Sequence, residues 1–267
     1  GLDAEEGSYK GSTDMNLIAS AYYYYSTGLL VKAGKVLGED VEKYEQNLEN
    51  IKSAYMKEYL PEGKLLCNTQ TACVLALHFG LYNDKEPIAK QLTELVETCG
   101  HLTTGFVGTP YLLHVLSDIG QNELAYKLLF RDEFPSWCYQ ITQGATTMWE
   151  RWNGYKPDGT FATPEMNSFN HYAYGAVGDW MYEKMCGIRQ KEGTAGFTDL
   201  VFSPVVTDSL SFAEASIDTR NGKVASRWEK TDDGILYTFL VPENVPAVAM
   251  INGKKYVLNT GINKITE

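Results

Sequence analysis

Apolar residues recur at helical spacing near the start of the chain. Leu17 and Ala21 begin a series that repeats every three or four residues, which predicts an amphipathic helix. Thr13 or Asp14 can cap its first turn through a side-chain oxygen, and Gly38 can end it in a left-handed conformation. The first element of the fold is therefore expected to be a long helix.

Apolar and amphipathic segments then alternate. Residues 40–59 predict a second helix with one charged face, while residues 69–79 and 109–119 are almost wholly apolar and should be buried. Residues 85–99 and 122–130 carry charges on one side and should lie outside. Repeated pairs of one buried and one half-exposed helix predict an α/α toroid whose apolar helices line the inner ring.

The pattern changes after the sixth predicted helix. Residues 134–166 form a polar stretch rich in Trp, Tyr, Gly and Thr, which predicts a long ordered loop, and such loops are usually functional. Residues 167–186 are again largely apolar and predict a closing helix. We therefore expect the functional residues of the helical part to lie near this loop.

Short β-branched and aromatic segments follow to the end of the chain. They are separated by turn signals such as DDG and NGK, and GILYTFLV alternates apolar and polar residues with the period of a strand. This pattern predicts a small antiparallel β-sandwich. The fold class is thus α+β, with a helical α/α-barrel domain over residues 1–188 and a β-sandwich domain over residues 189–267.

Composition narrows the classes of partner. The chain has 267 residues, 44% of them apolar, and a formal net charge of −11, which argues against nucleic acid and anionic membranes and tolerates a neutral substrate. No apolar run reaches the roughly 18 to 20 residues of a membrane span, and no signal peptide opens the sequence. Because the sequence lacks an initial methionine, its compartment stays open between cytoplasmic and periplasmic or secreted.

The five cysteines are scattered and show neither CxxC nor Cys/His spacing, so we interpret them as buried thiols. The sequence has no HExxH motif, no EF-hand loop and no glycine-rich phosphate loop. We accordingly expect no metal and no cofactor.

The candidate chemistry is concentrated between residues 136 and 180, which hold four of the five tryptophans. Glu150 stands between Trp149 and Trp152, and a polar cluster with Asn170 and His171 follows. Aromatic rings beside carboxylate, amide and imidazole groups suit a sugar, because rings pack on pyranose faces and polar groups bond the hydroxyls. Glu150 is therefore a candidate catalytic carboxylate of a glycoside hydrolase.

Two roles are open for Glu150 on these residues alone. The neighbouring Arg151 could help to keep it ionised, as a general base must be, or the two could form an ion pair with a purely structural role.

Three long motifs carry a resemblance to a known family. They are HLTTGFVGTPYLLHVLSDIGQNELAYKLL, PSWCYQITQGATTMWERWNG and MNSFNHYAYGAVGDWMY, at residues 101–129, 135–154 and 166–182. The chain closely resembles the C-terminal part of bacterial α-L-rhamnosidases of glycoside hydrolase family 78. The resemblance implies part of an (α/α)6 barrel followed by a C-terminal β-sandwich, with inverting release of terminal α-L-rhamnose. It further implies that Glu150 is the general base activating water and that His171 contacts the sugar.

The chain also departs from that family. The family's proton-donating glutamate lies well upstream, and a complete barrel has twelve helices, whereas the sequence predicts about seven or eight. The resemblance thus implies a fragment that lacks the general acid and is inactive alone. We expect the remainder of the parent chain, or self-association, to cover the open helical ring.

The weaker site candidates each have a structural alternative. His101 could line a rim of the toroid or form a plain turn, and Trp137 could bind sugar or stabilise the long loop. Trp149 and Trp152 could face the sugar or brace Glu150. Arg151 and Asn170 complete the set of predicted substrate-binding residues.

Asp179 and Glu165 would be the substitute donors if the chain were complete. The expected partner is a rhamnose-containing carbohydrate, with the natural glycoside left open. The alternative function is a non-catalytic carbohydrate-binding module; a purely structural toroid would leave the TTMWERWNG and SFNHYA motifs without a role.

Overall fold

The computed structural model describes residues 11–156, 158–161 and 166–267. The chain divides into two compact units, Gly1–Gly175 and Ala176–Glu267, and each is described by itself. This division lies earlier in the chain than the boundary predicted near Arg189, because the last helical turns pack against strands of the second unit. For example, Trp228 donates from Nε1 to the Met185 carbonyl at 2.9 Å. The domain boundary at residues 188 and 189 stays a prediction.

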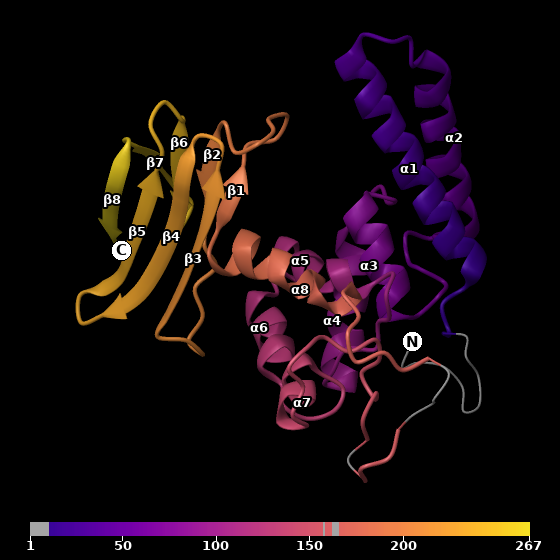
Figure 1. Ribbon diagram of the computed structural model, residues 1–267. Helices are drawn as coiled ribbons and strands as arrows, with labels where there is room; N and C mark the ends of the chain where they lie inside the picture. Colours follow the sequence, from indigo (N-terminus) through magenta and orange to yellow (C-terminus); the bar gives the residue numbers. More distant parts are fainter. Residues whose placement is uncertain (1–10, 157, 162–165) are drawn as a thin grey trace. The chain divides into compact units, whose positions relative to one another are not determined.

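The first unit is a row of helical hairpins (Figure 1). Consecutive helices pack as the pairs α1 with α2, α3 with α4 and α5 with α6, while α1 packs on α3 and α3 on α5. α1, α3 and α5 thus form one row, as expected for the inner helices of a toroid. The helices are α1 (Met15–Leu37), α2 (Glu42–Tyr59), α3 (Gln70–Phe79), α4 (Glu86–Cys99), α5 (Thr109–Asp118), α6 (Asn122–Phe130) and α7 (Trp137–Thr142).

Local signals set the helix ends much as predicted. Asp14, not Thr13, caps α1 and accepts from the backbone N–H groups of Asn16 and Leu17 at 2.6 and 3.0 Å. Gly38 ends α1 with a φ of 73°, which an L side chain rarely adopts. The predicted burial difference is also observed: every residue of α3 except His78 is buried, whereas α4 buries one face.

The predicted helix over residues 167–186 is wrong in its first third. Residues 167–172 are non-helical, and short helical segments follow: η1 (Ala173–Ala176), α8 (Val177–Trp180) and the π-helical η2 (Met181–Met185). The reason is a competing set of backbone hydrogen bonds. Glu150 donates to the Ser168 carbonyl at 2.9 Å, and His171 donates to the Met148 carbonyl at 2.8 Å, so this segment pairs with a distant loop.

The second unit contains two four-stranded sheets with the strand orders β1-β2-β6-β7 and β3-β4-β5-β8 (Figure 1). Phe202 of the first sheet contacts Phe239 of the second at a centroid distance of 4.7 Å, so the sheets share one core. The strands are β1 (Ile188–Gln190), β2 (Leu200–Phe202), β3 (Phe212–Thr219), β4 (Gly222–Thr231), β5 (Gly234–Val241), β6 (Ala247–Ile251), β7 (Lys254–Leu258) and β8 (Gly261–Thr266).

One pair departs from the antiparallel expectation. β2 and β6 are parallel, because the chain forms most of the other sheet before it returns to this one. The predicted alternation in β5 is present: Tyr237, Phe239 and Val241 are buried. The predicted NGK turn joins β6 to β7, with positive φ at Asn252 and Gly253.

The five cysteines are free thiols, but they are not uniformly buried. Cys73 and Cys186 are buried, Cys67 and Cys138 are half-buried, and Cys99 is exposed at the end of the amphipathic α4. None of the helices in the described ranges pairs the length with the hydropathy that a bilayer-spanning segment needs.

Candidate active site

Glu150 lies on a short backbone pairing between two loops. In addition to the two bonds that join residues 148–150 to residues 168–171, the Thr147 hydroxyl donates to the Phe169 carbonyl. The Trp149 N–H donates to Oε1 of the buried Gln140 at 3.3 Å. The backbone on both sides of Glu150 is thus fixed by hydrogen bonds.

The carboxylate of Glu150 is half-buried and has two different oxygens. Oε2 accepts from the Ser168 N–H at 2.8 Å, whereas Oε1 accepts no hydrogen bond within the described part of the chain. One oxygen is therefore held by the backbone and the other can receive a proton from a water molecule.

Arg151 does not form the ion pair that the sequence left open. Its Nε donates to Oδ1 of Asn153 at 3.4 Å, and no salt bridge joins it to Glu150 among the described residues. The structural ion-pair interpretation of Glu150 therefore has no contact to support it.

The segment that carries Glu150 contains a frame of three buried tryptophans. Trp137, Trp149 and Trp152 are 5%, 4% and 2% exposed. Trp137 donates from Nε1 to the Tyr174 carbonyl at 2.9 Å, and Trp152 donates to the Thr104 carbonyl at 3.3 Å. Their rings contact other protein rings. Of the two alternatives that the sequence left open, this favours bracing of the loop over direct contact with the sugar.

Tyr174 completes this frame, and sequence reasoning missed it. Its ring stacks on Trp152 with centroids 4.0 Å apart. Burial raises the pKa of Tyr174 above its ordinary value, the charge of Arg151 lowers it, and the charge of Glu150 raises it again. The phenol therefore stays protonated at neutral pH, within electrostatic reach of the Glu150 carboxylate.

His171 is held in one tautomer. The Ala173 N–H donates to its Nδ1 at 3.3 Å, so the ring carries its proton on Nε2, which can donate to a ligand oxygen. Phe106 and Tyr172 both lie parallel to the imidazole, with centroid distances of 5.0 and 5.4 Å and interplanar angles of 6°. Phe106 was also missed; its place in the HLTTGF motif, on the loop that includes His101, was the available signal.

The two remaining candidates differ in how they join the site. Asn170 is exposed beside His171, and its side-chain amide makes no hydrogen bond within the described residues, so it can meet a ligand. His101 instead bonds the Leu102 carbonyl through Nδ1 at 2.9 Å, and no contact in the described ranges links its ring to Glu150 or His171. Glu165 lies outside the described residues.

Family comparison places both parts of the chain. The family model described as the bacterial alpha-L-rhamnosidase 6 hairpin glycosidase domain matches residues 2–185. The model described as the bacterial alpha-L-rhamnosidase C-terminal domain matches residues 187–265.

The curated relatives that match this chain are named alpha-L-rhamnosidase. The chain is 42% identical over 243 residues to an alpha-L-rhamnosidase of Streptomyces avermitilis, which covers 90% of this chain and 23% of that protein. It is 41% identical over 250 residues to one of Formosa agariphila, at 91% and 27% coverage. The chain therefore spans about a quarter of the length of these relatives.

Solved structures share the fold. The crystal structure of the Streptomyces avermitilis alpha-L-rhamnosidase complexed with L-rhamnose matches with a TM-score of 0.89 and 35% identity, over 96% of this chain and 28% of that one. The native enzyme from Aspergillus terreus matches with a TM-score of 0.90 and 30% identity, over 95% and 30%.

Proposed function

The chain belongs to the bacterial α-L-rhamnosidase family, and from this premise we propose that it carries the general-base part of an inverting exo-glycosidase. The substrate is a glycoside or polysaccharide that ends in non-reducing α-L-rhamnose. The observation that carries the proposal is the Glu150 carboxylate, with one oxygen held by the Ser168 N–H and the other without a partner among the described residues.

Glu150 removes a proton from water as that water attacks the anomeric carbon. The bond from this carbon to the leaving oxygen breaks, a second carboxylic acid protonates the leaving oxygen, and the released rhamnose has the β configuration. Inverting enzymes keep these two carboxyl groups about 6.5–9.5 Å apart to admit the water. We propose that the acid belongs to a longer parent protein that contains residues 1–267.

We propose that the side chains around Glu150 bind the sugar or position the catalytic loop. His171 donates from Nε2 to a sugar hydroxyl, and Asn170 bonds another. Trp137, Trp149 and Trp152 hold the loop that carries Glu150, so their effect on the sugar is through position or through a ring edge. Arg151 adds positive charge near the site, and His101 stays a proposed rim residue.

The isolated chain of residues 1–267 is expected to have no α-L-rhamnosidase activity, because in this proposal the proton donor to the leaving oxygen belongs to the longer parent protein. The measurement is release of the chromophore from an aryl α-L-rhamnoside by the purified chain. Sustained hydrolysis would contradict the proposed position of the acid, and variants of Asp179 and Glu165 would then identify the substitute donor.

Truncating His171 to alanine in the parent protein is expected to lower kcat/KM about tenfold, because one hydrogen bond to the sugar is lost. Phe106→Leu should produce a smaller loss, since it keeps the imidazole but removes the parallel ring beside it. Steady-state kinetics on an aryl α-L-rhamnoside measure both. Equal activity of H171A and the unmodified enzyme would remove His171 from the site.

The open side of the helical unit needs a partner. α1 exposes several large apolar side chains, which is unusual on the surface of a soluble protein. They are Leu29 (48% exposed), Leu30 (46%), Val36 (87%) and Leu37 (75%). We propose that the remainder of the parent chain, or a second copy of this one, covers them.

A further inference from the structure

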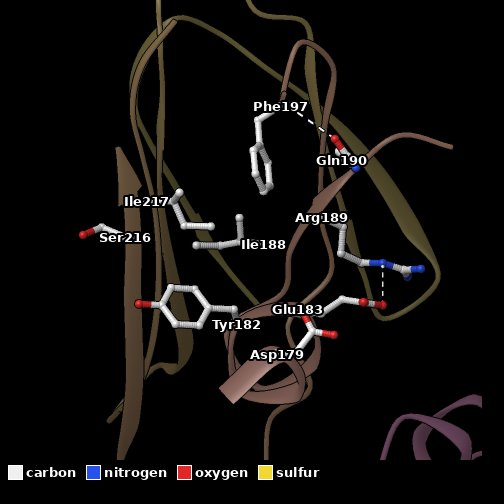
Figure 2. Close-up of a pocket in the computed structure, with 9 residues that line it drawn as sticks. All are labelled: Asp179, Tyr182, Glu183, Ile188, Arg189, Gln190, Phe197, Ser216 and Ile217. Carbon is white, nitrogen blue, oxygen red and sulfur yellow. Dashed lines mark hydrogen bonds and ion pairs between the residues drawn. The ribbon is translucent and has the colours of Figure 1, made fainter. Parts of the chain in front are cut away.

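The second unit contains a cavity that the proposed chemistry does not use. Its volume is about 500 Å³. The final helical turns, β1, the following loop and β3 supply its walls, which consist of Asp179, Tyr182, Glu183, Ile188, Arg189, Gln190, Phe197, Ser216 and Ile217 (Figure 2). None of these residues belongs to the set around Glu150, so the cavity requires its own explanation.

The interior of the cavity is apolar and aromatic. Figure 2 shows the Phe197 ring and the side chains of Ile188 and Ile217 directed toward the same space, with the Tyr182 ring beside them. Tyr182 is 43% exposed, which is high for a large ring in a folded unit. Two aromatic side chains thus offer ring surface to whatever enters.

The backbone of Phe197 is unusual. Its φ of 58° lies in the left-handed region that bulky residues rarely occupy. Its N–H donates to Oε1 of Gln190 at 3.5 Å, which links the loop to β1 (Figure 2). The loop therefore keeps an aromatic ring over the cavity in a conformation that glycine would adopt more easily.

Polar groups of both kinds also line the cavity. Nε of Arg189 lies 3.4 Å from Oε1 of Glu183, and Gln190 and Asp179 add an amide and a second carboxylate. Two carboxylates and one guanidinium line the cavity, and Nζ of Lys184 lies 3.5 Å from the same Glu183 oxygen, so the charges of these four groups balance and suit a neutral ligand. Donors and acceptors side by side suit hydroxyl groups, which both donate and accept.

We propose that this cavity is a second carbohydrate-binding site, one that holds a neutral pyranose without acting on it. The sugar packs a C–H face on Tyr182 and Phe197, and its hydroxyls bond Arg189, Glu183 and Gln190. A volume of about 500 Å³ lies in the common range for small-molecule sites. The choice of a sugar rests on the proposed function, since an enzyme that trims glycosides meets carbohydrate chains longer than the residue it removes.

The test is a titration of isotope-labelled residues 1–267 with L-rhamnose, D-galactose and D-glucose, and with D-galacturonate as the anionic comparison, followed by amide NMR. At least one neutral sugar should shift the amides of Tyr182, Arg189 and Phe197 with a Kd on the order of millimolar. Tyr182→Ala and Arg189→Ala should each weaken binding about tenfold. Phe212→Ala should not, because Phe212 is an exposed aromatic residue of β3 that does not line the cavity.

Thermal unfolding of each variant verifies that it is folded, and Arg189→Ala, at an exposed position, keeps the test valid if Tyr182→Ala unfolds. No shift with any neutral sugar, shifts that both variants leave unchanged, or stronger binding of galacturonate would overturn the proposal. Concentration-dependent broadening at these amides without sugar would also overturn it, by showing that a second copy fills the cavity.

Glu150→Gln should leave this binding unchanged, which separates the two proposals. If no sugar shifted the amides of the cavity, the proposed role of Glu150 as the general base would still stand. Conversely, if another residue proved to be the general base, a neutral sugar could still shift the amide of Tyr182.

Discussion

Replacing Glu150 with glutamine in the parent protein is expected to lower kcat about 10²–10⁴-fold, with little change in affinity for rhamnose. Glutamine keeps the shape and can still accept from the Ser168 N–H, but its amide cannot take a proton from water. Steady-state kinetics on an aryl α-L-rhamnoside give kcat, and titration calorimetry with L-rhamnose gives the affinity.

A matched control separates this effect from a general loss of charge. Glu62→Gln changes an exposed loop glutamate and should leave kcat within twofold of the unmodified enzyme. If E150Q and E62Q had similar activities, the carboxylate at position 150 would not be the base. A carbohydrate-binding module would behave differently again, since it has sugar affinity but no turnover to lose.

Replacing Gly187 with alanine is expected to lower the free energy of unfolding of the second unit by about 3 kcal/mol. An added Cβ would lie 2.1 Å from the Pro204 nitrogen and 2.4 Å from the Ser203 carbonyl carbon, so backbone would have to move. About 1 kcal/mol of this loss comes from the φ of 73°, which a residue with a side chain rarely adopts. Urea unfolding of residues 1–267, followed by circular dichroism, measures the change.

Gly193→Ala supplies the comparison, because it separates backbone conformation from steric conflict. Gly193 has a φ of 81°, but an added Cβ would meet nothing within 4 Å. It should therefore lose only the conformational part, about 1 kcal/mol. Equal losses at the two positions would show that the close approach of Gly187 to residues 203 and 204 contributes nothing.

The helical part could be predicted because its signals are local. Asp14 and Thr69 cap helices through their own side chains, and Pro110 lies in the first turn of α5, so a few neighbouring residues determine each end. The non-helical backbone of residues 167–172 could not be predicted, because the largely apolar residues that follow them make the whole segment resemble one helix. The backbone bonds of residues 167–172 to Met148 and Glu150 form only in the folded chain.

The same distinction applies to the site. Glu150 and His171 could be named as candidates from the long motifs that contain them, and their roles stay predictions. Phe106 and Tyr174 were missed, because their roles depend on ring contacts with residues distant in sequence. Phe106 contacts His171, and Tyr174 contacts Trp152. The roles of the tryptophans were left open for the same reason, since a motif shows that indole rings are near a carboxylate but not whether they are buried.

The parallel pairing of β2 with β6 could not be predicted from the sequence either. Strands of the second unit alternate clearly enough to be recognised one by one, yet their order depends on how the two sheets share a core. Short strands such as β1 and β2 carry too few residues to specify their neighbours.

The most direct test of Glu150 as the base is azide rescue of Glu150→Ala in the parent protein, with the product identified by NMR. Azide fits the space left by the carboxylate and attacks the anomeric carbon without needing a base, while the acid still protonates the leaving oxygen. The account predicts that azide restores turnover and that the product is β-L-rhamnosyl azide. An α-configured azide, or no rescue from a folded variant that still binds rhamnose, would contradict it.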